Sequence, residues 1–231
     1  MTLRLLKKDN GAHKPEREKD TYSLHIPAPH GCLEAVLREP LGPARGAAVV
    51  CHPHPLEGGT MHTKTVFRVA QALADVDIAA LRFNFRGVGT STGSYEEGVG
   101  ERSDVTAALD WLEDRYPGLP LVAGGVSFGS MVALGAAAPE RRVITLFGVG
   151  LPIRHNDFAF LGKSDKPVLI VQGEEDEFGS GREMEAVARQ LGPHVTLVRI
   201  SSADHLFNGC VNEMRTAISK YFERGERGHS V

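Results

Sequence analysis

Three short segments of this sequence carry groups that could do chemistry together, and each of them follows an apolar run. They contain Ser127, the acidic residues 174–177 and His205. A serine hydroxyl becomes nucleophilic when a histidine accepts its proton and a carboxylate orients that histidine. The order serine, acid, histidine is one that such triads use. We therefore expect Ser127 to be a nucleophile, His205 its general base and one nearby carboxylate the third member.

The pattern around Ser127 predicts a sharp turn between a strand and a helix. Residues 125–129 read GVSFG, follow the apolar run 119–125 and lead into a helix-forming stretch that Pro139 ends. In such a turn the serine backbone is strained and the hydroxyl is exposed at the edge of the sheet. The glycines at both ends remove side chains that would collide across the turn.

A second match to the same pattern, GTSTG at 89–93, is a control within the chain. No strand leads directly into it, because RGVG at 86–89 intervenes, and no helix-forming stretch follows it. A five-residue pattern without this context has low specificity. We therefore interpret Ser91 as a loop residue.

The partner acid must be chosen from two loops. Four carboxylates follow the apolar run 168–171, and a fifth precedes the histidine: Glu174, Glu175, Asp176, Glu177 and Asp204. We favour Asp176, because Gly173 lets the loop turn back toward His205. The glutamates are expected to be solvated rim charges, and Asp204 is expected to point elsewhere. The alternative for His205 is a capping or surface histidine at the last helix.

The oxyanion of an acyl-transfer intermediate needs two backbone N–H donors. One is predicted at Phe128, directly after the nucleophile. The second should come from the loop HPHPLEGGT, which follows the apolar run 47–51. Pro53 and Pro55 have no N–H, so His54 is the expected donor and Leu56 the next candidate.

The same loop could instead suggest a metal site or a phosphate site. His52, His54 and His62 match no strong zinc spacing, and the prolines restrict how the first two imidazoles can converge. The GGT stretch at 58–60 lacks the lysine of a P-loop. We therefore expect neither a metal nor another cofactor, and we interpret Cys51 as a small buried apolar residue.

Strand-like and helix-like segments alternate along the chain. Two runs, 22–27 and 32–37, predict an antiparallel hairpin. Further strands are predicted at residues 47–51, 78–83, 119–125, 143–149, 168–171 and 195–200. Helices are predicted around residues 66–73, 105–112, 130–138, 184–191 and 211–221. This alternation predicts an α/β fold with a mostly parallel eight-stranded sheet and helices on both faces.

Composition limits the partners that we expect. The 231 residues carry 26 Lys and Arg, 29 Asp and Glu, and three cysteines. The sequence has neither a basic stripe nor an apolar run of membrane-spanning length, so we expect no nucleic-acid or membrane partner. The short apolar start and the cysteine count predict a cytoplasmic protein. We expect a monomer or a homodimer that acts on a small-molecule ester. We expect a flexible arm at 1–20, one domain at 21–224 and a tail at 225–231.

Together these segments resemble the α/β-hydrolase superfamily, and most of all its small bacterial serine hydrolases of the dienelactone-hydrolase-like group, which have little or no lid. The resemblance covers about residues 20–222 and rests on five motifs: CHPHPLEGGTM at 51–61, NFRGVGTS at 84–91, GVSFG at 125–129, GEED at 173–176 and DH at 204–205. It implies an α/β-hydrolase fold, with Ser127, Asp176 and His205 as the triad.

The resemblance also implies a structural role for the turn at Arg86, beside the active site. Three positions differ from the family pattern. Pro53 stands where many relatives have Gly, and Asn84 stands where Asp is common, so no Asp–Arg bridge is expected there. The nucleophile is Ser127, where dienelactone hydrolases proper have a cysteine, so their substrate does not carry over.

Residues 150–167, between two predicted strands, are too few for a lid domain. An open cleft predicts a carboxylesterase that cleaves short to medium acyl esters through an acyl-enzyme intermediate. The alternatives are a thioesterase or an acyltransferase on the same triad, or a non-catalytic scaffold. Apolar side chains that could line the acyl site, or equally belong to the core, are Leu56, Leu151, Phe158, Phe160 and Phe207.

Overall fold

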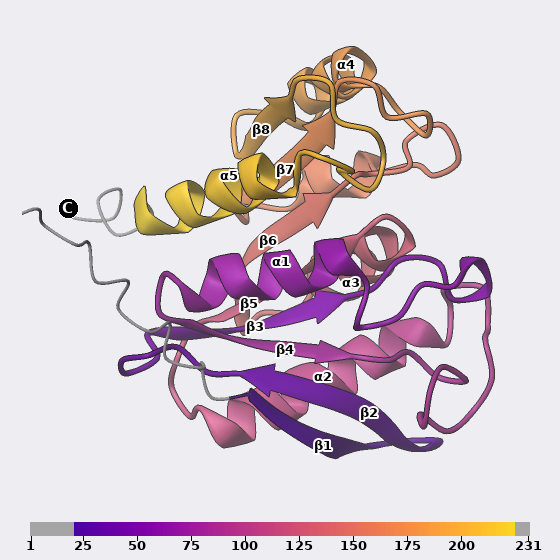
Figure 1. Ribbon diagram of the computed structural model, residues 1–231, viewed down its shortest axis with the longest axis vertical. Coiled ribbons are helices and arrows are strands. Elements are labelled where there is room, and N and C mark those ends of the chain that lie inside the picture. The colour runs from indigo at the N-terminus through magenta and orange to yellow at the C-terminus, as the bar shows by residue number, and fades with distance from the viewer. Residues whose placement is uncertain (1–20, 225–231) are drawn as a thin grey trace, which may run out of the picture.

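The computed structural model describes residues 21–224, and the arm expected at 1–20 and the tail expected at 225–231 lie outside them. Eight strands of the described residues form one sheet in the order β1-β2-β4-β3-β5-β6-β7-β8 (Figure 1). The strands are β1 Thr21–Ala28, β2 Gly31–Arg38, β3 Gly46–Cys51, β4 Ile78–Phe83, β5 Leu121–Val126, β6 Val143–Val149, β7 Val168–Gly173 and β8 Val195–Ile200.

The sheet is parallel except at one edge. β1 and β2 form the predicted antiparallel hairpin, and β2 also pairs antiparallel with β4. The pairs from β4 through β3, β5, β6 and β7 to β8 are all parallel. The prediction of a mostly parallel eight-stranded sheet is confirmed. The carboxyl ends of the parallel strands therefore meet at one edge, where the loops that follow them gather.

Helices cover both faces of the sheet, because its central strands are apolar on both sides. They are α1 Lys64–Ala74, α2 Glu101–Arg115, α3 Phe128–Ala137, α4 Gly181–Leu191 and α5 Val211–Arg224. One buried apolar cluster joins α2, α3 and α4 to the sheet, and a second joins α1 and α5 to the opposite face. None of the helices in the described residues is long and apolar enough to cross a membrane.

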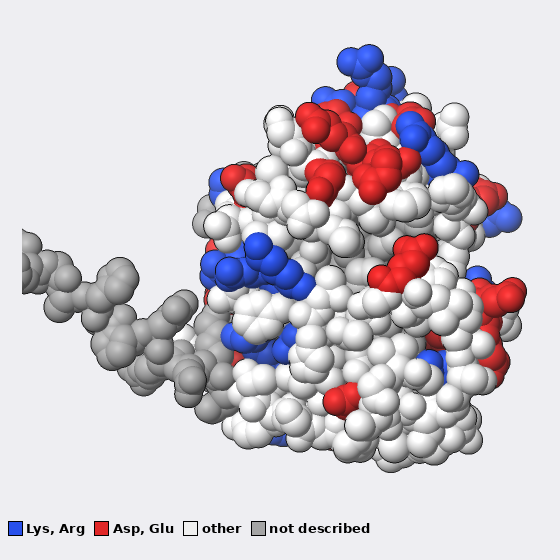
Figure 2. Space-filling model, turned by 45° about the vertical axis from the view of Figure 1, so that its right-hand side comes forward, with Lys and Arg blue, Asp and Glu red and all other residues white. Residues whose placement is uncertain are grey.

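The connection between β6 and β7 carries no lid domain. Within residues 150–167 the only regular element is a short 3-10 helix, Ala159–Lys163. Figure 2 turns the right-hand side of Figure 1, where the carboxyl ends of β3 and β4 point, toward the viewer. Figure 2 shows uncharged surface over much of this face, with acidic side chains at its upper end and just to the right of its centre.

Candidate active site

Ser127 lies in the turn from β5 to α3 with a strained backbone. Its φ of 55° and ψ of −123° place it in a region that side-chain-bearing residues rarely adopt. The turn is so tight that a Cβ at Gly125 would lie 2.6 Å from the carbonyl oxygen of Gly129. A Cβ at Gly129 would lie 2.6 Å from the carbonyl oxygen of Cys51. Both glycines are therefore needed where the turn meets the end of β3.

The structure brings the three predicted triad side chains together. The Ser127 Oγ lies 2.7 Å from Nε2 of His205, and Nδ1 of His205 lies 2.9 Å from both carboxylate oxygens of Asp176. A carboxylate only accepts, so Nδ1 carries the proton and donates it to Asp176. The neutral imidazole then has a free lone pair at Nε2, which accepts the hydrogen bond from the Ser127 hydroxyl.

Among the five candidate acids, the structure brings Asp176 to the histidine. Glu174 pairs with Arg199 at 3.1 Å, and Asp204 accepts hydrogen bonds from Asn208. The side chains of Glu175 and Glu177 are exposed. Gly173 makes this geometry accessible, because a Cβ there would lie 2.8 Å from the carbonyl oxygen of Asp204.

Two residues that the sequence did not single out hold Asp176. The buried Gln172 donates from Nε2 to Oδ2 of Asp176 at 2.8 Å, and its Oε1 accepts the amide of Leu151 at 2.8 Å. The amide of Phe178 donates to Oδ1 at 2.8 Å, and its ring lies 4.5 Å from the imidazole of His205. Gln172 ends a buried strand directly before the acid loop, and this buried polar position is the signal that could have identified it.

Two backbone amides beside Ser127 are free to donate. Among residues 21–224, the N–H groups of Phe128 and His54 have no hydrogen-bond acceptor. The close approach of Gly129 to the end of β3 brings the loop that carries His54 against the nucleophile turn. Leu56, the other candidate, donates its amide to Nδ1 of His54 at 3.2 Å and is therefore occupied.

The loop that carries His54 is fixed by contacts between its own histidines and residues outside it. Nε2 of the buried His52 accepts the amide of Phe85 at 3.1 Å, so Nδ1 carries the proton and donates to the carbonyl of Pro53. Burial lowers the pKa of His52 from 6.5 to about 4. Nε2 of His54 lies 3.0 Å from the hydroxyl of Tyr95, a residue that sequence reasoning missed.

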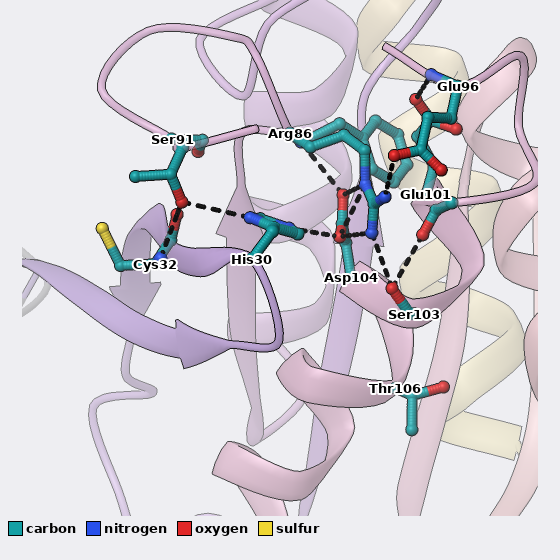
Figure 3. Close-up of polar contacts among 12 residues, drawn as sticks. His30, Cys32, Arg86, Ser91, Glu96, Glu101, Ser103, Asp104 and Thr106 are labelled. Carbon is teal, nitrogen blue, oxygen red and sulfur yellow. Dashed lines mark hydrogen bonds and ion pairs between the residues drawn. The ribbon is translucent and has the colours of Figure 1, made fainter. Parts of the chain in front are cut away.

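The segment that carries Tyr95 is anchored by a buried ion pair (Figure 3). Arg86 donates from Nη2 to Asp104 of α2 at 2.8 Å and from Nη1 to Glu96 at 2.8 Å. His30 also bonds Asp104, at 2.9 Å. Arg86 therefore forms its ion pair with Asp104 of α2, and no such pair involves Asn84.

Asn84 and Ser91, which lie near this ion pair in the sequence, form hydrogen bonds with other residues of the fold. Asn84 donates to Glu34 and accepts the amide of Met61. Ser91, the second G-x-S-x-G serine, is buried and donates to the carbonyl of Asn84 at 2.7 Å. The hydroxyl of Ser91 is therefore committed to holding its own loop.

The five predicted substrate-lining side chains lie in different surroundings. Leu151 and Phe207 are fully buried in the two core clusters, while Leu56 is 72% exposed. Phe158 lines a groove of about 460 Å³ against α4, and Phe160 lines one of about 420 Å³ beside α3. No triad residue lines either groove.

Comparison with known proteins agrees with this architecture. The chain matches the α/β-hydrolase domain family over residues 48–223. An uncharacterized protein of Rickettsia prowazekii is 32% identical over 207 residues, which span 86% of this chain and 87% of that protein.

Two solved structures are similar as well. An α/β serine hydrolase homologue from Coxiella burnetii has a TM-score of 0.82 and 36% identity, covering 87% of this chain and 96% of that chain. A serine hydrolase without a lid from Xanthomonas campestris has a TM-score of 0.81 and 31% identity, covering 92% and 97%. The family match spans most of the sheet described above, and this chain therefore belongs to the α/β-hydrolase superfamily.

Proposed function

We propose that this hydrolase is a serine carboxylesterase with Ser127 as nucleophile, His205 as general base and Asp176 as the acid that orients it. The observation that carries the proposal is the continuous hydrogen-bond chain from the Ser127 hydroxyl through the imidazole to the carboxylate. This arrangement can deprotonate an alcohol near neutral pH.

In the first half of the reaction, the Ser127 Oγ attacks the ester carbonyl carbon while its proton moves to Nε2 of His205. The carbonyl oxygen becomes an oxyanion, which the amides of Phe128 and His54 would bind. Asp176 stabilises the imidazolium that forms. The tetrahedral intermediate collapses, the C–O bond to the leaving alcohol breaks, and His205 returns the proton to that alcohol.

In the second half, water replaces the alcohol. His205 takes a proton from water, and the resulting hydroxide attacks the acyl carbon bound to Ser127. Collapse of this intermediate releases a carboxylic acid and returns the proton to Ser127. No resident cofactor is needed for either half.

The surroundings of the triad favour a small uncharged ester as the substrate. Uncharged surface covers much of the face that includes the carboxyl edge, although acidic side chains lie just to the right of its centre (Figure 2). The ring of Phe178 lies 4.5 Å from that of His205, and the buried ring of Phe128 lies 4.9 Å from that of His54, so apolar rings pack against both histidines of the site. Without a lid domain this surface is short, so we infer a preference for short to medium acyl groups.

Hydrolysis of 4-nitrophenyl esters from acetate to palmitate tests the proposal. We expect kcat/KM to be highest for short to medium acyl chains and to fall for palmitate. Ser127→Ala should lower kcat at least about 10³-fold, whereas Ser94→Ala, which changes an exposed loop serine, should not. A folded Ser127→Ala protein with the activity of the parent would overturn the assignment. A matched series of acyl thioesters distinguishes the thioesterase alternative.

A further inference from the structure

Two arginines are buried on the face of the sheet that α1 covers. Arg82 of β4 pairs with Val36 of β2, and Arg38 lies two residues further along β2. Paired residues and residues two apart in a strand project from the same face, so both side chains lie together. Arg38 is 8% exposed and Arg82 is 3% exposed.

Both guanidinium groups pack against one aromatic ring on α1. The guanidinium carbons of Arg38 and Arg82 lie 4.9 and 5.3 Å from the centroid of the Phe67 ring. A third arginine, Arg68, lies 5.9 Å from the same centroid. Such contacts stabilise a cation, but they do not neutralise its charge.

Neither buried arginine has an acidic partner among residues 21–224. Arg82 donates from Nη1 to the carbonyl of Met61 at 2.8 Å. The Nε atoms of both arginines are buried without a hydrogen-bond partner, and they are the only such side-chain atoms in the described residues. Neighbouring arginines are already paired, Arg68 with Gln71 and Arg215 with Asp75.

Arg86 is a buried arginine of this chain that does have acidic partners. Arg86 is 6% exposed and contacts Asp104, Glu96 and Ser103 (Figure 3). Burial of unpaired charge is costly unless a counterion is supplied. At Arg82, burial and the nearby charge of Arg38 lower the pKa to about 10. The arginine pair therefore lacks the counterion that the Arg86 site contains.

The unpartnered outer nitrogens of the pair are not completely buried. Both Nη atoms of Arg38 and Nη2 of Arg82 have no hydrogen-bond partner among the described residues. Of the unpartnered nitrogens of the pair, the two Nε atoms are buried and these Nη atoms are not. A guanidinium presents planar N–H pairs that match the oxygens of phosphate. The two positive charges of adjacent guanidinium groups are balanced by the two negative charges of a phosphate dianion, whereas a single carboxylate balances one of them.

We propose that Arg38 and Arg82, beside Phe67, form a binding site for a phosphate group, separate from the triad and independent of the proposed esterase activity. Inorganic phosphate and the phosphate of a small phosphomonoester share the chemistry that the two arginines recognise. Binding would place a dianion between two groups that otherwise repel each other.

Thermal unfolding of the full-length chain at constant ionic strength tests this site. We expect inorganic phosphate to raise Tm by about 2–4 °C with saturation, and sodium chloride at equal ionic strength to leave Tm unchanged. Arg38→Met and Arg82→Met should each abolish the phosphate effect. Arg189→Met, which changes an exposed arginine on α4, should retain it. Glycerol phosphate, compared with inorganic phosphate, distinguishes the two sources.

Calorimetric titration of the unaltered protein with phosphate gives a readout that does not depend on the variants. We expect one phosphate per chain. No saturable heat and no Tm shift would overturn the proposal, as would a Tm shift that survives in both folded variants. An equal Tm shift with acetate would overturn the assignment of a dianion.

Discussion

Acid should destabilise this protein through His52. The imidazole is fully buried at the start of the loop that carries His54, and burial lowers its pKa from 6.5 to about 4. Because the folded-state pKa is lower, the unfolded chain binds more protons between these values. The stabilisation that comes from keeping His52 neutral is therefore present above pH 6.5 and is lost as the pH falls toward 4. Protonation also removes the lone pair that accepts the amide of Phe85.

The magnitude follows from the two pKa values of His52. Between pH 7 and pH 5, preferential protonation of the unfolded chain lowers the free energy of unfolding by about 2 kcal/mol. This is a substantial part of the roughly 5–15 kcal/mol that stabilises a typical domain. The effect should therefore be measurable against the titration of all other groups, provided that a matched variant removes only His52.

Urea unfolding at pH 7, 6 and 5 measures this contribution. His52→Asn keeps a donor and an acceptor but does not titrate, so the original chain should lose about 2 kcal/mol more than the variant across this interval. Equal pH slopes for the two proteins would refute the reasoning. An NMR titration of the imidazole provides a direct check, because a His52 pKa near 6.5 in the folded protein would also contradict it.

Three further substitutions test the site and its support. Asp176→Asn should lower kcat for ester hydrolysis by about 10³–10⁴-fold, because an amide does not hold the required tautomer of His205; an unchanged kcat would contradict this. Gly129→Ala should destabilise the protein by about 1–3 kcal/mol in urea and reduce kcat, because the new methyl group collides with backbone at the end of β3. Gly42→Ala, where the new Cβ meets only an ordinary contact at 3.7 Å, is the control, and equal losses would contradict the steric argument. Asp104→Asn should lower the free energy of unfolding by about 3 kcal/mol, because Arg86 stays buried with its main partner neutral; a loss below about 1 kcal/mol would contradict it.

The sequence was most informative where local chemistry decides the structure. Apolar runs predicted β4 and β6 at the residues where the structure has them, since a largely buried strand leaves a distinct pattern. β8 was also predicted at its residues, although it is an edge strand with no buried residue. The turn at Ser127 was predictable because only glycine fits at 125 and 129. Asp176 could be selected from a run of acids because Gly173 permits the close approach to the loop of His205.

Contacts between distant segments could not be predicted in the same way. Tyr95 reaches His54 across 41 positions, and Arg86 meets Asp104 rather than a neighbour in its own turn. The sequence does not distinguish whether an apolar residue such as Phe207 belongs to the core or to a pocket, because apolar side chains occur in both environments. Likewise, no local pattern marks Arg38 and Arg82 as a pair, since only the register of β2 against β4 brings them together.

Covalent labelling with a fluorophosphonate, followed by peptide mapping, tests the central claim most directly. The reagent bonds to a serine only where that serine is activated, so one adduct should form per chain, on the peptide that contains Ser127. The adduct should be absent in Ser127→Ala and strongly slowed in His205→Ala. An adduct on Ser91, or labelling that persists in Ser127→Ala, would contradict the account.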